Sequence, residues 1–171
     1  MNYNIAILGL VEIISAITIG LIILSLTYKI MTWVGEKYYN IFEYNQAYSI
    51  FTAAIILSVG IMVSGVLQPL LSSFRLLNKA DDSFWITLKY LGTGAFYIGI
   101  AYFATIVIGL ISTFLYSRLT PIDEFDEMRK NNIGVSLIIS SILITMTILV
   151  KDGVMTIIEA LVPYPELPPT I

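Results

Sequence analysis

Apolar residues run in four long stretches along the chain, and this pattern predicts four membrane-spanning helices. The stretches cover residues 5–26, 47–71, about 85–115 and 133–162. Each is long enough to cross a hydrocarbon core of about 30 Å, which takes about 20 helical residues. Charge inside the stretches is rare: Glu12 interrupts the first, and Lys151 and Asp152 lie late in the fourth. The first stretch lacks the basic start and the cleavage site of a signal peptide, so we expect it to remain as an anchor.

The connection before the fourth stretch predicts a short amphipathic helix on the membrane surface. The sequence Thr-Pro-Ile-Asp at residues 120–123 is typical of a helix start, because it supplies a cap, an early proline and an acidic residue. Ile122, Phe125 and Met128 then recur at helical spacing and form an apolar face. A polar connecting loop is the alternative. The tail at residues 163–171 is rich in proline, and we expect it to be extended.

The second half of the chain resembles the first. The second and fourth stretches align without a gap at an offset of 87 residues, which places Asn45 on Asn132 and Ser49 on Ser136. The first and third stretches align at an offset of 89 residues and share the sequence Ile-Gly-Leu-Ile. We therefore predict an all-α membrane protein built from two parallel two-helix repeats. The predicted parts are a first repeat at residues 1–75, a connecting loop at 76–84, a second repeat at 85–162 and the tail at 163–171.

Small residues lie on two nearly opposite faces of the second and fourth stretches, counted at about 100° per residue. In the second stretch, stripe A comprises Ser49, Ala53, Gly60 and Ser64, and stripe B comprises Ala54, Ser58 and Gly65. In the fourth stretch, stripe A comprises Ser136, Ser140, Thr147 and Lys151, and stripe B comprises Ser141, Thr145 and Asp152. The first and third stretches carry a similar seam of Ala16 with Gly20 and Thr105 with Gly109. Helices in a bilayer associate through such residues, so we expect one neighbour inside the chain and another in a second copy. The alternative is that the hydroxylated faces line a pore.

Composition supports the membrane interpretation and excludes several classes of protein. Hydrophobic residues make up 57% of the 171 residues and charged residues 12%, against about 45–50% and about 25% in soluble domains. The nine Lys and Arg residues and the net charge of −3 provide no basic stripe for nucleic acid. The chain has no His and no Cys, so we expect no enzymatic activity and no metal or cofactor site.

Two short motifs carry a family resemblance. They are Asn-Gln-Ala-Tyr-Ser at residues 45–49 and Asn-Ile-Gly-Val-Ser at residues 132–136, each preceded by acidic residues. The unit resembles the Domain of Unknown Function 350 (DUF350) family of bacterial inner-membrane proteins, which usually has Gly before the Asn, where this chain has Tyr44 and Asn131. The resemblance implies a multi-span inner-membrane protein without an established biochemical activity. It also implies a role as a partner subunit.

Charged residues inside the spans are costly, so Glu12, Lys151 and Asp152 form a candidate functional cluster. Counted by helix rise, Glu12 and Lys151 lie at similar depths, about 25–28 Å from the same surface. The three side chains could extend to the far interface, Glu12 could pair with Lys151, or the cluster could form an ion or proton path. Asn45 and Asn132 are interpreted as helix N-caps, with a ligand or gating role as the alternative.

Basic residues favour one orientation of the four spans, because cytoplasmic loops are enriched in Lys and Arg. The first and third loops hold Lys29, Lys37, Arg118, Arg129 and Lys130, whereas the opposite side holds Arg75, Lys79 and Lys89, with Lys151 near the end of its span. These loops are therefore predicted to be cytoplasmic, with both termini outside. The most consistent function is a non-enzymatic membrane subunit that associates with itself or with other membrane proteins. The alternative is a subunit of an ion channel or small-solute transporter.

Overall fold

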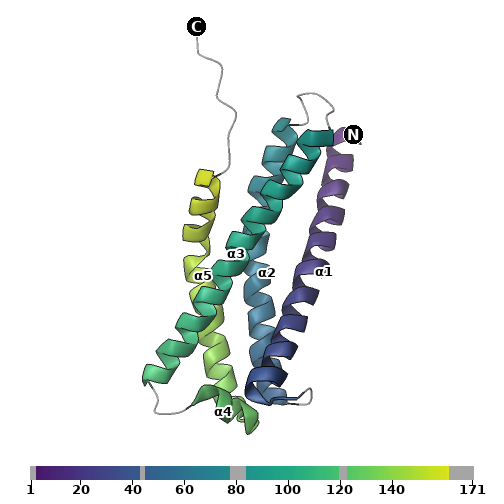
Figure 1. Ribbon diagram of the computed structural model, residues 1–171. Helices are drawn as coiled ribbons and strands as arrows, with labels where there is room; N and C mark the ends of the chain where they lie inside the picture. Colours follow the sequence, from purple (N-terminus) through teal and green to yellow (C-terminus); the bar gives the residue numbers. More distant parts are fainter. Residues whose placement is uncertain (1–2, 43–44, 78–83, 120–122, 162–171) are drawn as a thin grey trace.

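The computed structural model describes residues 3–42, 45–77, 84–119 and 123–161 as an all-helical protein (Figure 1). Its elements are α1 (Tyr3–Tyr39), α2 (Gln46–Leu77), α3 (Phe84–Leu119), α4 (Glu124–Arg129) and α5 (Ile133–Leu161). The segments long and apolar enough to cross a membrane are Ala16–Tyr39, Gln46–Val66, Gly94–Leu119 and Ile133–Leu161. This confirms the predicted all-α membrane fold with four spanning helices, and the short helix α4 precedes the fourth span as predicted.

Helix α1 extends further than the apolar pattern indicated. It continues past residue 26 through an aromatic segment and ends at Tyr39. The extension packs against the start of α2 and against α4, and this packing stabilises helical turns that sequence hydropathy alone does not require. Asn40 follows with a φ of 56°, in the left-handed region that often terminates a helix.

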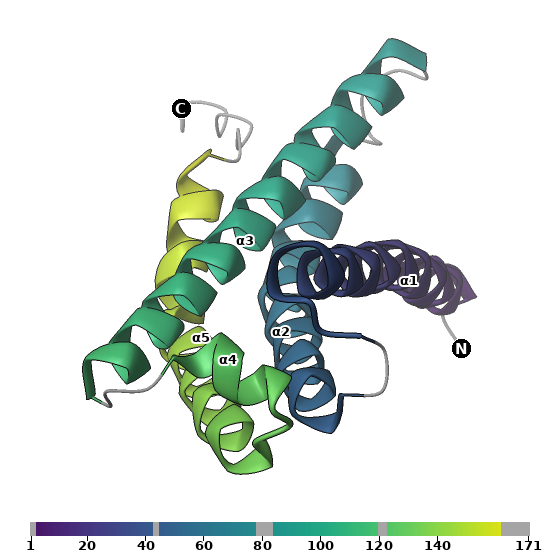
Figure 2. The same cartoon turned by 60° about the horizontal axis from the view of Figure 1, so that its bottom comes forward.

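The centre of the protein is a long contact between α2 and α5, which lie side by side and run in the same direction from the end where α4 lies (Figures 1 and 2). Buried residues on α5 recur at intervals of three, four or seven, as in closely packed helix pairs. Those that follow this spacing are Ser136, Ser140, Leu143, Thr147, Val154 and Ile158. Small side chains at this seam let the two helices approach closely.

The outer helices are not placed equivalently. Helix α3 crosses over both α2 and α5, whereas α1 packs against α2 and α4 (Figure 2). The parallel course of α2 and α5 is what two parallel repeats require, while the different contacts of α1 and α3 depart from strict two-fold symmetry. The two-repeat organisation therefore stays a prediction. The tail and most of the predicted connecting loop lie outside the described residues.

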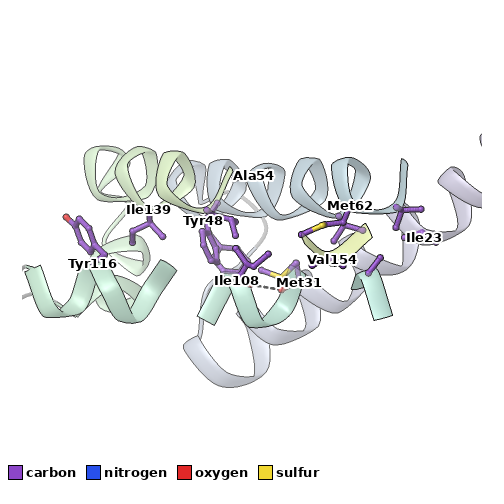
Figure 3. Packing of buried hydrophobic residues seen from close by; sticks show 14 of the residues in the cluster. Ile23, Met31, Tyr48, Ala54, Met62, Ile108, Tyr116, Ile139 and Val154 are labelled. Atoms are coloured by element: carbon purple, nitrogen blue, oxygen red, sulfur yellow. Dashed lines mark hydrogen bonds between the residues drawn. The ribbon is translucent and has the colours of Figure 1, made fainter. Parts of the chain in front are cut away.

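Helix α1 approaches α2 closely at Gly35. The Tyr48 hydroxyl donates a hydrogen bond to the Met31 carbonyl oxygen at 2.6 Å, which holds the Tyr48 ring against α1 (Figure 3). A Cβ atom on Gly35 would lie 2.6 Å from Tyr48 Cε1 and 2.8 Å from its Cζ. Gly35 thus provides the space that the anchored ring occupies.

We expect Gly35→Ala to destabilise the protein by about 1–3 kcal/mol, because the ring is held by its hydrogen bond and must shift to admit the methyl group. The matched control is Gly20→Ala on the same helix, since no atom lies within 4 Å of the Cβ that it would add. Thermal unfolding in detergent measures both. Equal melting temperatures for the two variants would contradict the close packing of α1 on Tyr48.

Candidate functional site

A group of hydrogen bonds joins the two halves of the chain where α2, α4 and α5 meet. We call this group the polar joint; it comprises the side chains of Asn45, Asn131 and Ser136 and the backbone of Ala47. Asn45 Oδ1 accepts the Tyr48 backbone N–H at 2.8 Å, which is the geometry of an N-cap on α2. Its Nδ2 also donates to the carbonyl oxygens of Met128 at 2.6 Å and Arg129 at 3.2 Å. The Met128 carbonyl also accepts the Asn131 backbone N–H at 2.9 Å, so Asn45 adds a donor to the last carbonyls of α4 and joins them to the start of α2.

The second half of the chain binds back to the first turn of α2. The Asn131 side-chain oxygen accepts the Ala47 backbone N–H at 3.0 Å, and the Ser136 hydroxyl donates to the Ala47 carbonyl oxygen. Asn131 has a φ of 65°, a conformation that Gly adopts most easily and Asn tolerates. Asn131 therefore takes the backbone conformation that Gly favours and adds a hydrogen bond that Gly cannot make.

The sequence pattern does not identify Asn131 as a site residue, because the alignment pairs Asn45 with Asn132. Asn132 Oδ1 accepts the Val135 N–H at 3.4 Å, and its Nδ2 donates to Glu127 Oε2 at 2.8 Å. Asn132 thus caps α5 and binds within the second half, whereas Asn131 reaches across to the first. The signal in the sequence was an Asn directly after a short predicted helix, where left-handed residues are common.

Helix α4 is amphipathic and covers the joint. Phe125 stacks on Tyr39 of α1 with ring centroids 3.9 Å apart and meets Phe51 of α2 edge-on at 6.0 Å. On the outer side, Asp126 pairs with Arg129 at 2.6 Å and with Lys130 at 2.7 Å. Hydrogen bonds from Lys130 and Arg129 lower the pKa of the Asp126 carboxyl. The apolar side of α4 thus contacts α1 and α2, and Asp126 and Arg129 lie on the outer side, whereas Glu124 is buried.

Helices α2 and α5 contact each other through different stripes of small residues. Stripe A of α5 lies at the contact with α2, and its residues Ser136, Ser140 and Thr147 are buried. Stripe B of α5, formed by Ser141, Thr145 and Asp152, is exposed.

On α2 the use is reversed. Stripe B shares the face of Ala47, which bonds to Ser136, and ends at Gly65, whose added Cβ would lie 2.6 Å from Met155 Sδ of α5. Stripe A has exposed Ser49, Ala53 and Ser64, with Gly60 half-buried near Leu24.

The predicted intramembrane cluster is spread over two sides of the molecule. Lys151 is half-buried and Asp152 exposed on α5, about 27–29 Å along the helix from its start. Neither the Lys151 ammonium nor the Asp152 carboxylate has a hydrogen-bond or ion-pair partner among the residues that the structure describes, although the Asp152 backbone carbonyl accepts from the Thr156 hydroxyl at 2.9 Å. Helices α1 and α5 lie on opposite sides of α2 (Figure 2), and the side chain of Glu12 lies outside the described residues. The pairing of Glu12 with Lys151 stays a prediction.

The seams predicted on the outer helices also differ. On α1, Ala16 is half-exposed and Gly20 has open space where a Cβ would be. On α3, Thr105 is buried and an added Cβ on Gly109 would lie 3.8 Å from Leu143 of α5. Only the α3 seam meets a helix of the same chain within the described part.

A partly open apolar cavity of about 300 Å³ lies between α1, α2 and α3, and Tyr39 and Phe125 are among the residues that line it. Its threonine hydroxyls, on Thr27, Thr105 and Thr113, donate to backbone carbonyls four residues earlier. The cavity therefore presents a largely apolar wall. Across the described residues, no three His, Cys, Asp or Glu side chains gather in a way that could hold a metal ion.

A known family model matches the second half of the chain. Residues 90–162 match the family model described as Domain of Unknown Function (DUF350). This confirms the resemblance to the DUF350 family for the second motif, residues 132–136, and the match covers most of α3 with α4 and α5. The first motif, residues 45–49, lies outside the matched region. Neither a curated protein nor a solved structure matches the chain significantly. The family description assigns no activity.

We expect Asn45→Ala to cost about 1 kcal/mol for the lost cap on α2, with a further loss of about 0.5–1.5 kcal/mol for the broken bonds to the Met128 and Arg129 carbonyls. Asn132→Ala is the matched control, since it removes a cap without breaking a bond between the halves. Chemical or thermal unfolding in detergent compares them. If Asn132→Ala were as destabilising as Asn45→Ala, the joint would not be what holds α4 to α2.

Proposed function

We propose that this four-span membrane protein with a DUF350 domain is a non-enzymatic subunit that associates with further copies of itself in the bilayer. The observation that carries the proposal is the exposed stripe B of α5. Ser141, Thr145 and Asp152 lie on a face that no helix of the chain covers in the described structure. A face of this kind suits a protein neighbour better than lipid tails.

The physical argument is the cost of polar groups in hydrocarbon. Insertion scales assign an Asp at the centre of a spanning helix about 2.5–3.5 kcal/mol, and the cost is smaller near the far interface, toward which Asp152 lies. Ser141 reduces its own cost by donating to the Leu137 carbonyl at 2.8 Å, whereas the Asp152 carboxylate has no partner in the described part of the chain. Close helix packing through small and polar residues lowers such costs, and it is the principal source of helix association in membranes.

Other exposed surfaces are those expected to face lipid. Leu110 and Phe103 on α3 are each 67% exposed, and Leu21 on α1 is 64% exposed. The contrast between these apolar faces and stripe B of α5 supports a specific association surface. A different membrane protein could occupy the same face, as the family resemblance suggests, and copurification would reveal it.

A channel or transporter subunit is the alternative function. It requires a continuous polar path, and the space inside the described bundle is filled by Met62, Ile139 and Leu143. Hydroxyls lining the apolar cavity are bonded to their own helices. Conduction through one copy is therefore disfavoured, and the alternative depends on a lumen between copies.

The proposed location is the bacterial inner membrane with the α4 end in the cytoplasm. The family resemblance supports the membrane, and the basic residues support the orientation, since they gather near the α4 end. These residues are Lys29, Lys37, Arg118, Arg129 and Lys130.

The purified protein is expected to form a complex of several copies in mild detergent, and Thr145→Trp is expected to dissociate it by placing a large ring on stripe B. Multi-angle light scattering or native mass spectrometry measures the mass. Phe103→Trp, on an exposed face of α3, is the control and should leave the mass unchanged. A monomeric wild-type protein would remove the basis for the proposed function.

Orientation is testable because the chain has no native cysteine. Ser117→Cys lies exposed near the α4 end and Glu159→Cys lies exposed near the opposite end. In intact cells, a membrane-impermeant maleimide should label position 159 and leave position 117 unlabelled until the cells are opened. Labelling of position 117 alone in intact cells would reverse the proposed orientation.

A further inference from the structure

We infer that copies of this protein associate head to tail, with stripe B of α5 in one copy packed on stripe A of α2 in the next. The inference rests on the proposed self-association and specifies its surfaces. It follows from how the chain already packs α2 on α5. The occupant of the exposed faces is thus a second copy of the same chain.

The contact inside the chain joins unlike faces. Stripe B of α2 meets stripe A of α5, as the bond from the Ser136 hydroxyl to Ala47 and the contact between Gly65 and Met155 show. If the aligned helices were related by a two-fold axis, the same stripe of each would meet at the axis. An unlike contact instead leaves one stripe of each kind outside the contact between α2 and α5. On stripe A of α2, Leu24 of α1 lies near Gly60, and α1 shares a hollow with Ser49 and Ala53.

The two stripes outside the contact between α2 and α5 correspond by alignment to the two stripes that form it. Stripe A of α2 corresponds by alignment to the buried stripe A of α5, and stripe B of α5 corresponds to the buried stripe B of α2. Residues Ser49, Ala53, Ser64, Ser141, Thr145 and Asp152 on these two stripes are exposed. The exposed stripe of each helix therefore resembles a stripe that already packs against a helix inside the chain. This resemblance identifies the other exposed stripe as its partner.

The internal contact also sets the register between copies. Within the chain, Ser136 donates to the carbonyl of Ala47. In the alignment, Ser49 corresponds to Ser136 and Gly134 corresponds to Ala47. A contact of the same kind between two copies would place Ser49 of one copy beside the Gly134 carbonyl of the next. Ser49 and Gly134 are both exposed, and a Cβ added at Gly134 meets only Asn132 Oδ1, at 3.5 Å. The same correspondence places Thr145 beside Gly60 of the neighbouring copy.

Repeated unlike contacts close into a ring when the rotation between neighbours divides a full turn. On each inner helix the two stripes lie about 130° apart around the axis, counted at about 100° per residue. That angle closes a ring of about seven helices, so with two helices per copy the ring contains about three or four copies. Leu57, Leu137 and Ile148 lie on the shorter arc between the stripes, and α1 and α3 pack on the longer arc. The ring therefore has α2 and α5 inside and α1 and α3 outside.

Cysteine crosslinking tests this arrangement. Ser49→Cys and Gly134→Cys are made as separate single variants with different tags, expressed together and oxidised in membranes. We expect a disulfide-linked pair that carries both tags, and little crosslinking when either variant is expressed alone. Gly60→Cys with Thr145→Cys is a second pair at a deeper level, which serves if the first pair disturbs the helix starts.

The outcomes separate the two proposals. Crosslinking of Gly134→Cys with itself would indicate a symmetric contact between α5 helices and would overturn the head-to-tail arrangement. An oligomeric wild-type mass without crosslinks at either mixed pair would also overturn it, while leaving self-association standing. A monomeric wild-type protein would refute both. A crosslinked mixed pair with a mass of three or four copies supports the ring.

Discussion

The close parallel packing of α2 on α5 is the contact on which the rest of this structure depends. In a bilayer the hydrophobic effect does not drive helices together, so association relies on close approach and on satisfied polar groups. Ala54 and Ser58 on α2 and Ser136 and Thr147 on α5 are small enough to allow this approach, and all four are buried. Helix α3 then lies over the pair, and α1 packs against the α2 side of it.

Hydrogen bonds at the α4 end complete this contact. The ends of spanning helices carry unpaired backbone groups that must find partners near the edge of the hydrocarbon. Asn45 and Asn131 supply these partners across the two halves, and Phe125 of α4 stacks on Tyr39 of α1. The short helix α4 thus ties α1, α2 and α5 together at one end, where a long flexible connection could not.

The same packing makes the molecule asymmetric and leaves small and polar residues exposed on both inner helices. Because α2 and α5 meet through unlike faces, each retains an uncovered stripe, and the one on α5 includes Asp152. An uncovered carboxylate on a spanning helix is costly unless another group or the interface satisfies it. Self-association through the uncovered stripes would bury small residues on both sides of each inner helix. The apolar outer faces of α1 and α3 would remain in lipid.

The sequence by itself determined the class of protein, the four spans, the short helix before the last span and the small residues at the helix contacts. Hydropathy and helical periodicity are local properties, and the bilayer enforces helices, so these features follow from residue order alone. The sequence also selected Asn45 and Ser136, because capping residues and small residues have local signatures.

Only the tertiary structure decided which faces meet. Both stripes on α2 and on α5 are suited to packing, and nothing local distinguishes the stripe that contacts the chain's own helix from the one left uncovered. The roles of Asn131 and Gly35 likewise depend on partners far away in the sequence, Ala47 and Tyr48. The similar depths of Glu12 and Lys151 did not reveal that α1 and α5 lie on opposite sides of α2. Helix rise measures position along a helix and carries no information about position around the bundle.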